Sequence, residues 1–163
     1  MVTDKAKKLF ESNNVYNHIE LEARHEIELE KYIKKVQIES RMMAELATSH
    51  ILPAAIRYQN ILLENIKGMK DAGIPNVSCD QRTKVLTKIS EHINQVSESV
   101  TEMIEARKVC NAISDTREKA IAYGSKVKEA YFDKIRYHVD KMELLVDDKE
   151  WYLPKYREML FLR

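Results

Sequence analysis

Glu22 and His25 are the first residues whose types and spacing could support chemistry. They form an E-x-x-H pair, and this spacing places two metal ligands on one helix face, as in di-iron carboxylate bundles. Such a site needs a second E-x-x-H pair. The residues three positions before the other histidines are not glutamates but Val15, Ala47, Ile89 and Ile135. The isolated pair therefore favours surface or interhelix polar contacts over a metal site.

The other residues that could do chemistry also favour structural roles. His138 falls on an apolar stripe, where a hydrogen-bonded core histidine is expected in preference to a ligand or a general base. Cys79 and Cys110 lie too far apart for a zinc knuckle, and one pair is too few for a disulfide scaffold. Neither a glycine-rich phosphate loop nor a G-x-S-x-G motif occurs. We therefore expect no catalytic, cofactor-binding or metal-binding residue in this chain.

The composition is typical of long amphipathic helices. The 163 residues include only three glycines and three prolines, while 33% are charged and 44% are hydrophobic. The net charge of +1 offers no field of one sign for nucleic acid or anionic lipid. No apolar run approaches the roughly 20 residues that span a bilayer, and no secretory signal opens the chain. We expect a soluble cytoplasmic protein with neither nucleic acid nor membrane as a partner.

Turn residues divide a single helical domain, residues 1–163, into five parts. These are a short N-terminal helix and turn, a long kinked helix, two further helices and a tail, over residues 1–16, 17–73, 78–112, 115–147 and 148–163. Gly73 with Pro75 is a strong stop signal. Pro53 lies inside the long helix, where it removes one backbone bond and predicts a kink or break near Ser49.

Cap signals predict where the later helices begin. Ser78 with Gln81 has the spacing of a capping box, and Ser114, Asp115 and Thr116 are candidate caps for the following helix. Short connections make successive helices antiparallel. The sequence therefore predicts an all-α fold: an antiparallel up-and-down bundle of three long helices plus a short N-terminal helix, with an aromatic-rich C-terminal tail.

Apolar stripes at three- and four-residue steps predict the core of this bundle. The expected buried residues on the three long helices are Leu29, Ile33, Val36, Met43, Ala47, Leu86, Ile89, Ile93, Val96, Val100, Met103, Cys110, Val127, Tyr131, Ile135, Met142 and Leu145. Ser40 and Arg107 interrupt the stripes. Met42 and Met43 are expected to fill gaps in the core, in preference to lining a ligand groove.

The C-terminal tail carries the candidate interaction or packing residues. It holds the only tryptophan and much aromatic content outside any clear helical period, in Trp151, Tyr152, Leu153, Pro154, Tyr156, Leu160 and Phe161. So much apolar surface must be buried against something. Either Trp151 and Leu153 fold back over the bundle end and residues 156–161 form a short closing helix, or the last aromatic residues dock on another surface. We favour the first.

Four blocks of the chain resemble type III glutamine synthetases. Residues 151–161 are similar to the terminal W-P-x-P-x-Y-x-x-L-L-F signature of that family, and residues 135–147 to its last helix. Residues 20–27 and 51–54 resemble the E-L-E-(S/A)-R-Y-E-I and I-L-P-A blocks of the family. His25 replaces the usual aromatic residue, and Tyr152 the usual proline. The four blocks occur in the same order as in the family, and together they span nearly the whole chain.

The resemblance implies a C-terminal helical domain of a larger enzyme. The parent would join glutamate and ammonia through a γ-glutamyl phosphate, using ATP and a divalent metal such as magnesium. Those parts would lie upstream, so this chain alone is expected to be inactive and to hold no cofactor. The implied partners are the catalytic domain of the parent chain and neighbouring subunits of a homo-oligomer, which the domain would brace or help assemble. A free-standing helical scaffold or coiled-coil interaction module remains the alternative.

Overall fold

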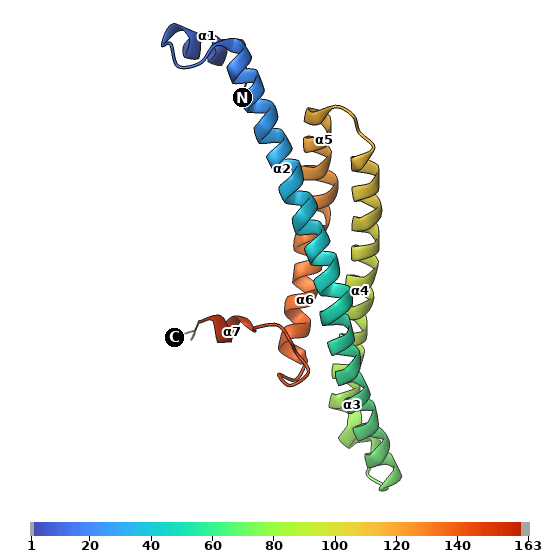
Figure 1. The fold of residues 1–163 in the computed structure, drawn as a ribbon. Helices are drawn as coiled ribbons and strands as arrows, with labels where there is room; N and C mark the ends of the chain where they lie inside the picture. Colours follow the sequence, from blue (N-terminus) through green and yellow to red (C-terminus); the bar gives the residue numbers. More distant parts are fainter. Residues whose placement is uncertain (1, 161–163) are drawn as a thin grey trace.

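The chain folds almost entirely into helices (Figure 1). The computed structural model describes residues 2–160, without the side chains of residues 76, 77 and 156. Over these residues there are helices of several kinds and no strand, which confirms the all-helical class.

Helix α1 (Asp4–Ser12) and helix α2 (His18–Leu46) begin at side-chain caps. Thr3 accepts a hydrogen bond from the Ala6 amide, and Asn17 forms a capping box with Glu20. Between the two helices Asn14 has φ of 54°, the left-handed conformation that asparagine tolerates. Local polar side chains therefore fix the turn that the sequence predicted here.

Helix α2 continues through a π-helical turn, η1 (Ala47–Ile51), into helix α3 (Leu52–Asp71). Pro53 lies in the first turn of α3 and has no amide hydrogen to donate to the Ser49 carbonyl, so the regular α-helical ladder cannot run through this point. The irregularity falls around Ser49, and the chain remains helical across it. Gly73, with φ of 74°, closes the C-terminal end of α3.

Helix α4 (Asp80–Asn111) follows a short 3-10 turn, η2 (Asn76–Cys79). The predicted capping box of Ser78 and Gln81 is wrong. Cys79 occupies the N-cap in a helical conformation and makes no side-chain cap bond, because the 3-10 turn runs directly into the helix. The Ser78 carbonyl instead accepts a hydrogen bond from the Arg82 guanidinium at 3.0 Å.

Three long helical segments, which we call rods, make up the bundle: α2 with η1 and α3 is the first, and α4 is the second. The last rod contains three elements. Helix α5 (Thr116–Ala122) leads into a ten-residue π-helix, η3 (Tyr123–Phe132), and then into helix α6 (Asp133–Leu145). Asp115 is the N-cap of α5, as its position predicted, and accepts a hydrogen bond from the Glu118 amide at 2.7 Å. In the described part of the tail, residues Tyr156–Met159 form the short helix α7.

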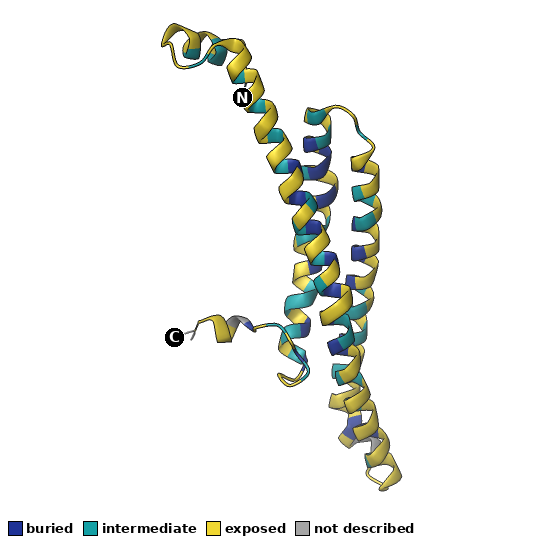
Figure 2. Ribbon diagram, in the orientation of Figure 1, coloured by how far each residue is buried: buried dark blue, intermediate teal, exposed yellow. Residues whose placement is uncertain are grey.

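The three rods are staggered along their length (Figure 1). Helix α4 packs against α3, η3 and α6, while α2 packs against α5. The start of α2, with α1, extends beyond one end of the bundle, and the α3–α4 hairpin extends beyond the other (Figure 1). Only the middle of the molecule therefore contains all three rods, and buried residues concentrate there (Figure 2).

The buried faces follow the predicted stripes with local exceptions. Ile33, Val36, Ile89, Val96, Val100, Met103, Val127, Ile135 and Met142 are buried in one cluster. Six residues predicted to be buried are only partly buried: Leu29, Met43, Leu86, Ile93, Tyr131 and Leu145. Ile93, for example, lies at the edge of the α4 stripe. Ser40 interrupts the α2 stripe yet is fully buried, and its hydroxyl donates to the Gln37 carbonyl at 3.0 Å.

Candidate functional site

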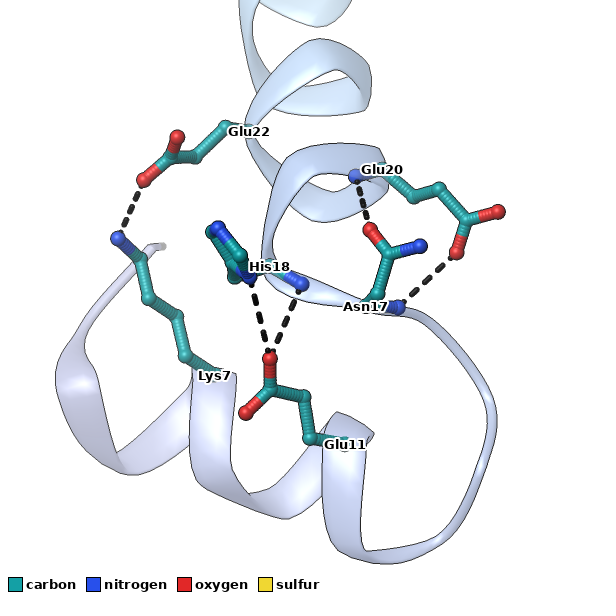
Figure 3. A network of polar contacts seen from close by, with 6 residues as sticks. All are labelled: Lys7, Glu11, Asn17, His18, Glu20 and Glu22. Atoms are coloured by element: carbon teal, nitrogen blue, oxygen red, sulfur yellow. Dashed lines mark hydrogen bonds and ion pairs between the residues drawn. The ribbon is translucent and has the colours of Figure 1, made fainter.

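The E-x-x-H pair lies where α1 packs on α2. Glu22 forms an ion pair with Lys7 of α1, and this contact lowers the pKa of Glu22 and raises that of Lys7. Nearby, Glu11 accepts a hydrogen bond from the His18 amide at 3.2 Å, next to the Asn17 and Glu20 capping box (Figure 3). Among the described residues, no three His, Cys, Asp or Glu side chains come together as metal ligands. Glu22 thus holds α1 against α2.

His138 pairs with a second histidine that the sequence did not single out. The Nδ1 atoms of His92 on α4 and His138 on α6 lie 2.9 Å apart. The ring centroids are 5.2 Å apart. This is close to the Nδ1–Nδ1 distance plus the distance from each Nδ1 atom to the centre of its own ring. The two nitrogens therefore point almost directly at each other. This geometry suits a shared proton, whereas two ligands of one metal ion must both point at a third position.

Tyr123 ties three rods together near the C-terminal end of α4. Its side chain is fully buried, and its hydroxyl donates to Asn111 Oδ1 of α4 at 2.5 Å. Gln37 Nε2 of α2 donates to the same tyrosine oxygen at 3.1 Å and to Asn111 Oδ1 at 2.9 Å. The three side chains satisfy one another, so this polar cluster fixes the register of the helices.

The structure places Trp151 against the bundle. Its side chain is 7% exposed, and Leu153 packs on the same core cluster. Lys155 is also buried: its ammonium donates to the Val146 carbonyl at 2.9 Å, lies 2.6 Å from an Asp148 carboxylate oxygen and is 6.0 Å from the centre of the Trp151 ring. The ammonium is thus paired within the tail, as a buried charge must be.

A second contact fastens the tail to α3. The Arg57 guanidinium bonds a Glu150 carboxylate oxygen at 3.0 Å and lies 5.2 Å from the centre of the Tyr152 ring. The Tyr152 side chain is otherwise exposed.

In the described part of the tail, the helix after Lys155 turns away from the bundle, and Arg157 pairs back to Asp148. Pro154 is exposed, and α7 projects away from α6 (Figure 1). Met159 and Leu160 are 50% and 79% exposed, so the predicted closing helix forms but these residues do not cover the bundle end. The side chain of Tyr156 and the whole of Phe161 lie outside the described residues.

An apolar groove of about 590 Å³ lies between the first and last rods. It is lined chiefly by apolar side chains, with charged groups at its rim: Met42, Met43, Leu46, Phe132, Val139 and Leu153, with Glu39, Lys128 and Arg136. Met42 is 46% exposed, so the prediction that both methionines fill the core is wrong. Residues of η1 and η3 also line the groove, which places both π-helical segments beside it.

Sequence reasoning missed the groove and the partner of His138. His92 directly precedes Ile93 and lies one turn from the buried Ile89, and this spacing is the available signal that it faces α6. For the groove, the available signal is the adjacent pair Met42 and Met43, which the prediction assigned to the core. No helix in the described part of the chain combines the length and the apolar character that crossing a bilayer requires.

Comparison with known proteins gives a consistent family. Residues 1–70 match the model of the glutamine synthetase C-terminal domain. The chain is 41% identical to a glutamine synthetase of Bacteroides fragilis and 30% identical to a type-3 glutamine synthetase of Dictyostelium discoideum. The alignments cover 98% and 99% of this chain but 22% of each relative. The chain thus spans about a fifth of the length of these relatives.

Proposed function

Because the chain belongs to the family of glutamine synthetase C-terminal domains, we propose that it is the non-catalytic helical domain of a type III glutamine synthetase. The single observation that carries this proposal is the alignment of nearly the whole chain with about a fifth of each relative. In the parent enzyme, the remaining chain would bind ATP and a divalent metal such as magnesium and would join glutamate to ammonia. This domain would supply none of the reacting groups.

The role we propose is to brace the catalytic domain of the same polypeptide and to contribute to assembly of a homo-oligomer. The groove between the first and last rods supports this role. Its apolar lining with charged residues at the rim is the pattern of a surface that binds another apolar segment. Methionines adapt to partner shapes because their side chains are flexible, and Met42 and Met43 lie in this groove. We propose that a segment of the catalytic domain occupies it.

Substitution of Met42 in the complete enzyme tests this role. Met42→Glu places a charge in the groove, and because the side chain is already 46% exposed, the isolated domain should fold as before. The matched control is Ile61→Glu on α3, at a side chain that is 48% exposed and does not line the groove. We expect Met42→Glu to reduce the oligomer mass and glutamine formation, and Ile61→Glu to leave both unchanged. Equal behaviour of the two variants contradicts docking through the groove.

The alternative is a free-standing helical scaffold or coiled-coil interaction module. The mass of the native polypeptide distinguishes the two functions. A polypeptide as long as the relatives supports the accessory domain, whereas one ending at these 163 residues supports the scaffold. For the accessory domain, calorimetry of the isolated chain with ATP and magnesium should show no binding, because phosphoryl transfer depends on positioned metals and cationic clamps that we assign to the catalytic domain.

A further inference from the structure

We propose that His92 and His138 form an acid-sensitive latch between α4 and α6, closed when the two rings share a proton and open when both are fully protonated. This inference rests on the geometry of the pair and is independent of the proposed function. The two residues are 46 positions apart in sequence, and they meet only because α4 and α6 pack against each other.

The contact requires the two rings to be in different states. With the Nδ1 atoms 2.9 Å apart and facing each other, one nitrogen must carry a hydrogen and the other must offer its lone pair. A neutral pair meets this requirement when the rings adopt opposite tautomers. A pair with one added proton also meets it, because an imidazolium can donate to a neutral ring.

A second added proton breaks the contact. Both Nδ1 atoms then carry hydrogens, so neither can accept, and two positive rings face each other. Lys88 and Glu91 of α4 and Lys134 and Lys141 of α6 are the charged groups whose fields act on the pair. Glu91 favours a positive charge on His92, whereas the three lysines oppose a further positive charge on the pair. The Tyr137 ring meets His138 edge-on.

Burial acts in the same direction as the lysines. It lowers the pKa of His92 and of His138 from their ordinary value of 6.5, and the charge of His92 lowers the pKa of His138 further. The unfolded chain therefore takes up protons at a higher pH than the folded chain. A group with a lowered pKa contributes stability that is present above 6.5 and is lost as the pH falls below it. The latch should consequently weaken in mild acid.

Opening the latch should loosen the packing interface between α4 and α6, which we call the seam. Ile89, Ile135 and Met142 are buried within one helical turn of the two histidines, so their packing depends on the same seam. The tail begins just after α6 and packs Trp151 on the same core cluster. Mild acid should therefore increase exposure of the tail as well as of the seam.

Denaturant unfolding as a function of pH tests the latch. Variants His92→Gln, His138→Gln and their combination are compared with His50→Gln, a control at an exposed histidine of η1. As the pH falls below 6.5, each extra proton bound by the unfolded chain raises the unfolding constant up to about tenfold per pH unit. We expect the unfolding constants of the wild type and of His50→Gln to rise equally as the pH falls. In the double variant, the part of this rise that comes from protonation of His92 and His138 should be absent. An equal rise in all chains overturns the proposal.

Nitrogen NMR of the imidazole rings provides a second readout that does not depend on how stable the variants are. In the wild-type chain at neutral pH, one Nδ1 should carry a hydrogen and the other should be unprotonated, with coupled titration of the two rings in acid. Independent titration of His92 and His138 overturns the latch even if the variants do not fold.

Discussion

Single buried polar residues decide how the rods of this bundle are aligned. Tyr123 is the clearest case, because its hydroxyl lies among three helices and is bonded on both sides by Asn111 and Gln37. A buried hydroxyl without partners is costly, so the bundle is held in the one register that satisfies all three groups. Apolar contacts alone would tolerate small shifts between the rods.

Removing the Tyr123 hydroxyl should destabilise the chain. We expect Tyr123→Phe to lower the free energy of unfolding by about 1 kcal/mol, because the ring still fills its site while two hydrogen bonds are lost and Asn111 keeps its bond from Gln37. Tyr152→Phe is the control: that side chain is 74% exposed, and its change should stay within about 0.5 kcal/mol. Urea unfolding measures both. Equal losses in the two variants would show that the Tyr123 cluster contributes no net stability.

At the scale of helices, local signals fix most ends, but backbone geometry within the rods is less regular than the stripes suggested. Asn17 and Asp115 cap their helices with side-chain oxygens. The first rod passes through η1 and the last through η3, where the wider helical turn shifts the faces of the residues that follow. For η1 the cause is Pro53. The η3 segment contains no proline. It does contain Gly124, where an added Cβ atom would come 3.1 Å from the Tyr32 hydroxyl oxygen.

The two predicted caps give a direct comparison between a cap that forms and one that does not. Asp115→Ala should lower the free energy of unfolding by about 1 kcal/mol, because the Glu118 amide at the start of α5 loses its acceptor. Ser78→Ala should change it by less than about 0.5 kcal/mol, because the Ser78 side chain does not cap α4. Thermal or urea unfolding of the two variants provides the measurement. A loss at Ser78 as large as that at Asp115 would restore the capping box at α4.

At the scale of the whole molecule, the staggered rods divide the chain into a packed middle and exposed ends. The overhanging part of α2 presents Ile19 and Ile27, and the far end of the tail presents Met159 and Leu160. Between these ends, the tail is fastened at two points, through Trp151 and Lys155 near α6 and through Glu150 and Tyr152 to Arg57 of α3. The tail therefore packs on the folded body up to Lys155, and α7 then projects away from α6 while Arg157 stays paired with Asp148.

Fluorescence of the single tryptophan checks this arrangement. We expect blue-shifted emission and slow quenching by acrylamide in a verified monomer, because Trp151 is only 7% exposed. The control moves the reporter by one residue, in the variant Trp151→Phe with Tyr152→Trp. Position 152 is 74% exposed, so this chain should emit at longer wavelength and be quenched readily. Emission typical of water from the native Trp151 would mean that the tail does not pack on the bundle in solution.

The all-helical class, the main breaks in the chain and most buried positions could be derived from the sequence. These features depend on local chemistry. Apolar residues recur at helical spacing, Gly73 adopts the positive φ needed to end α3, and Asp115 caps the start of α5. The resemblance to type III glutamine synthetases also rested on contiguous blocks, and the relatives confirmed it. Each of these signals lies within a few neighbouring residues.

Only the tertiary structure shows that His92 meets His138 and that Met42 lines a groove instead of filling the core. The same holds for the hydrogen bonds among Gln37, Asn111 and Tyr123. The physical reason is that these features depend on the stagger and rotation of one rod against another. A helical period tells which residues share a face, but it does not tell how far the facing rod is shifted along the axis. Packing of all three rods sets that shift, and with it which polar groups meet and where the apolar surface stays open.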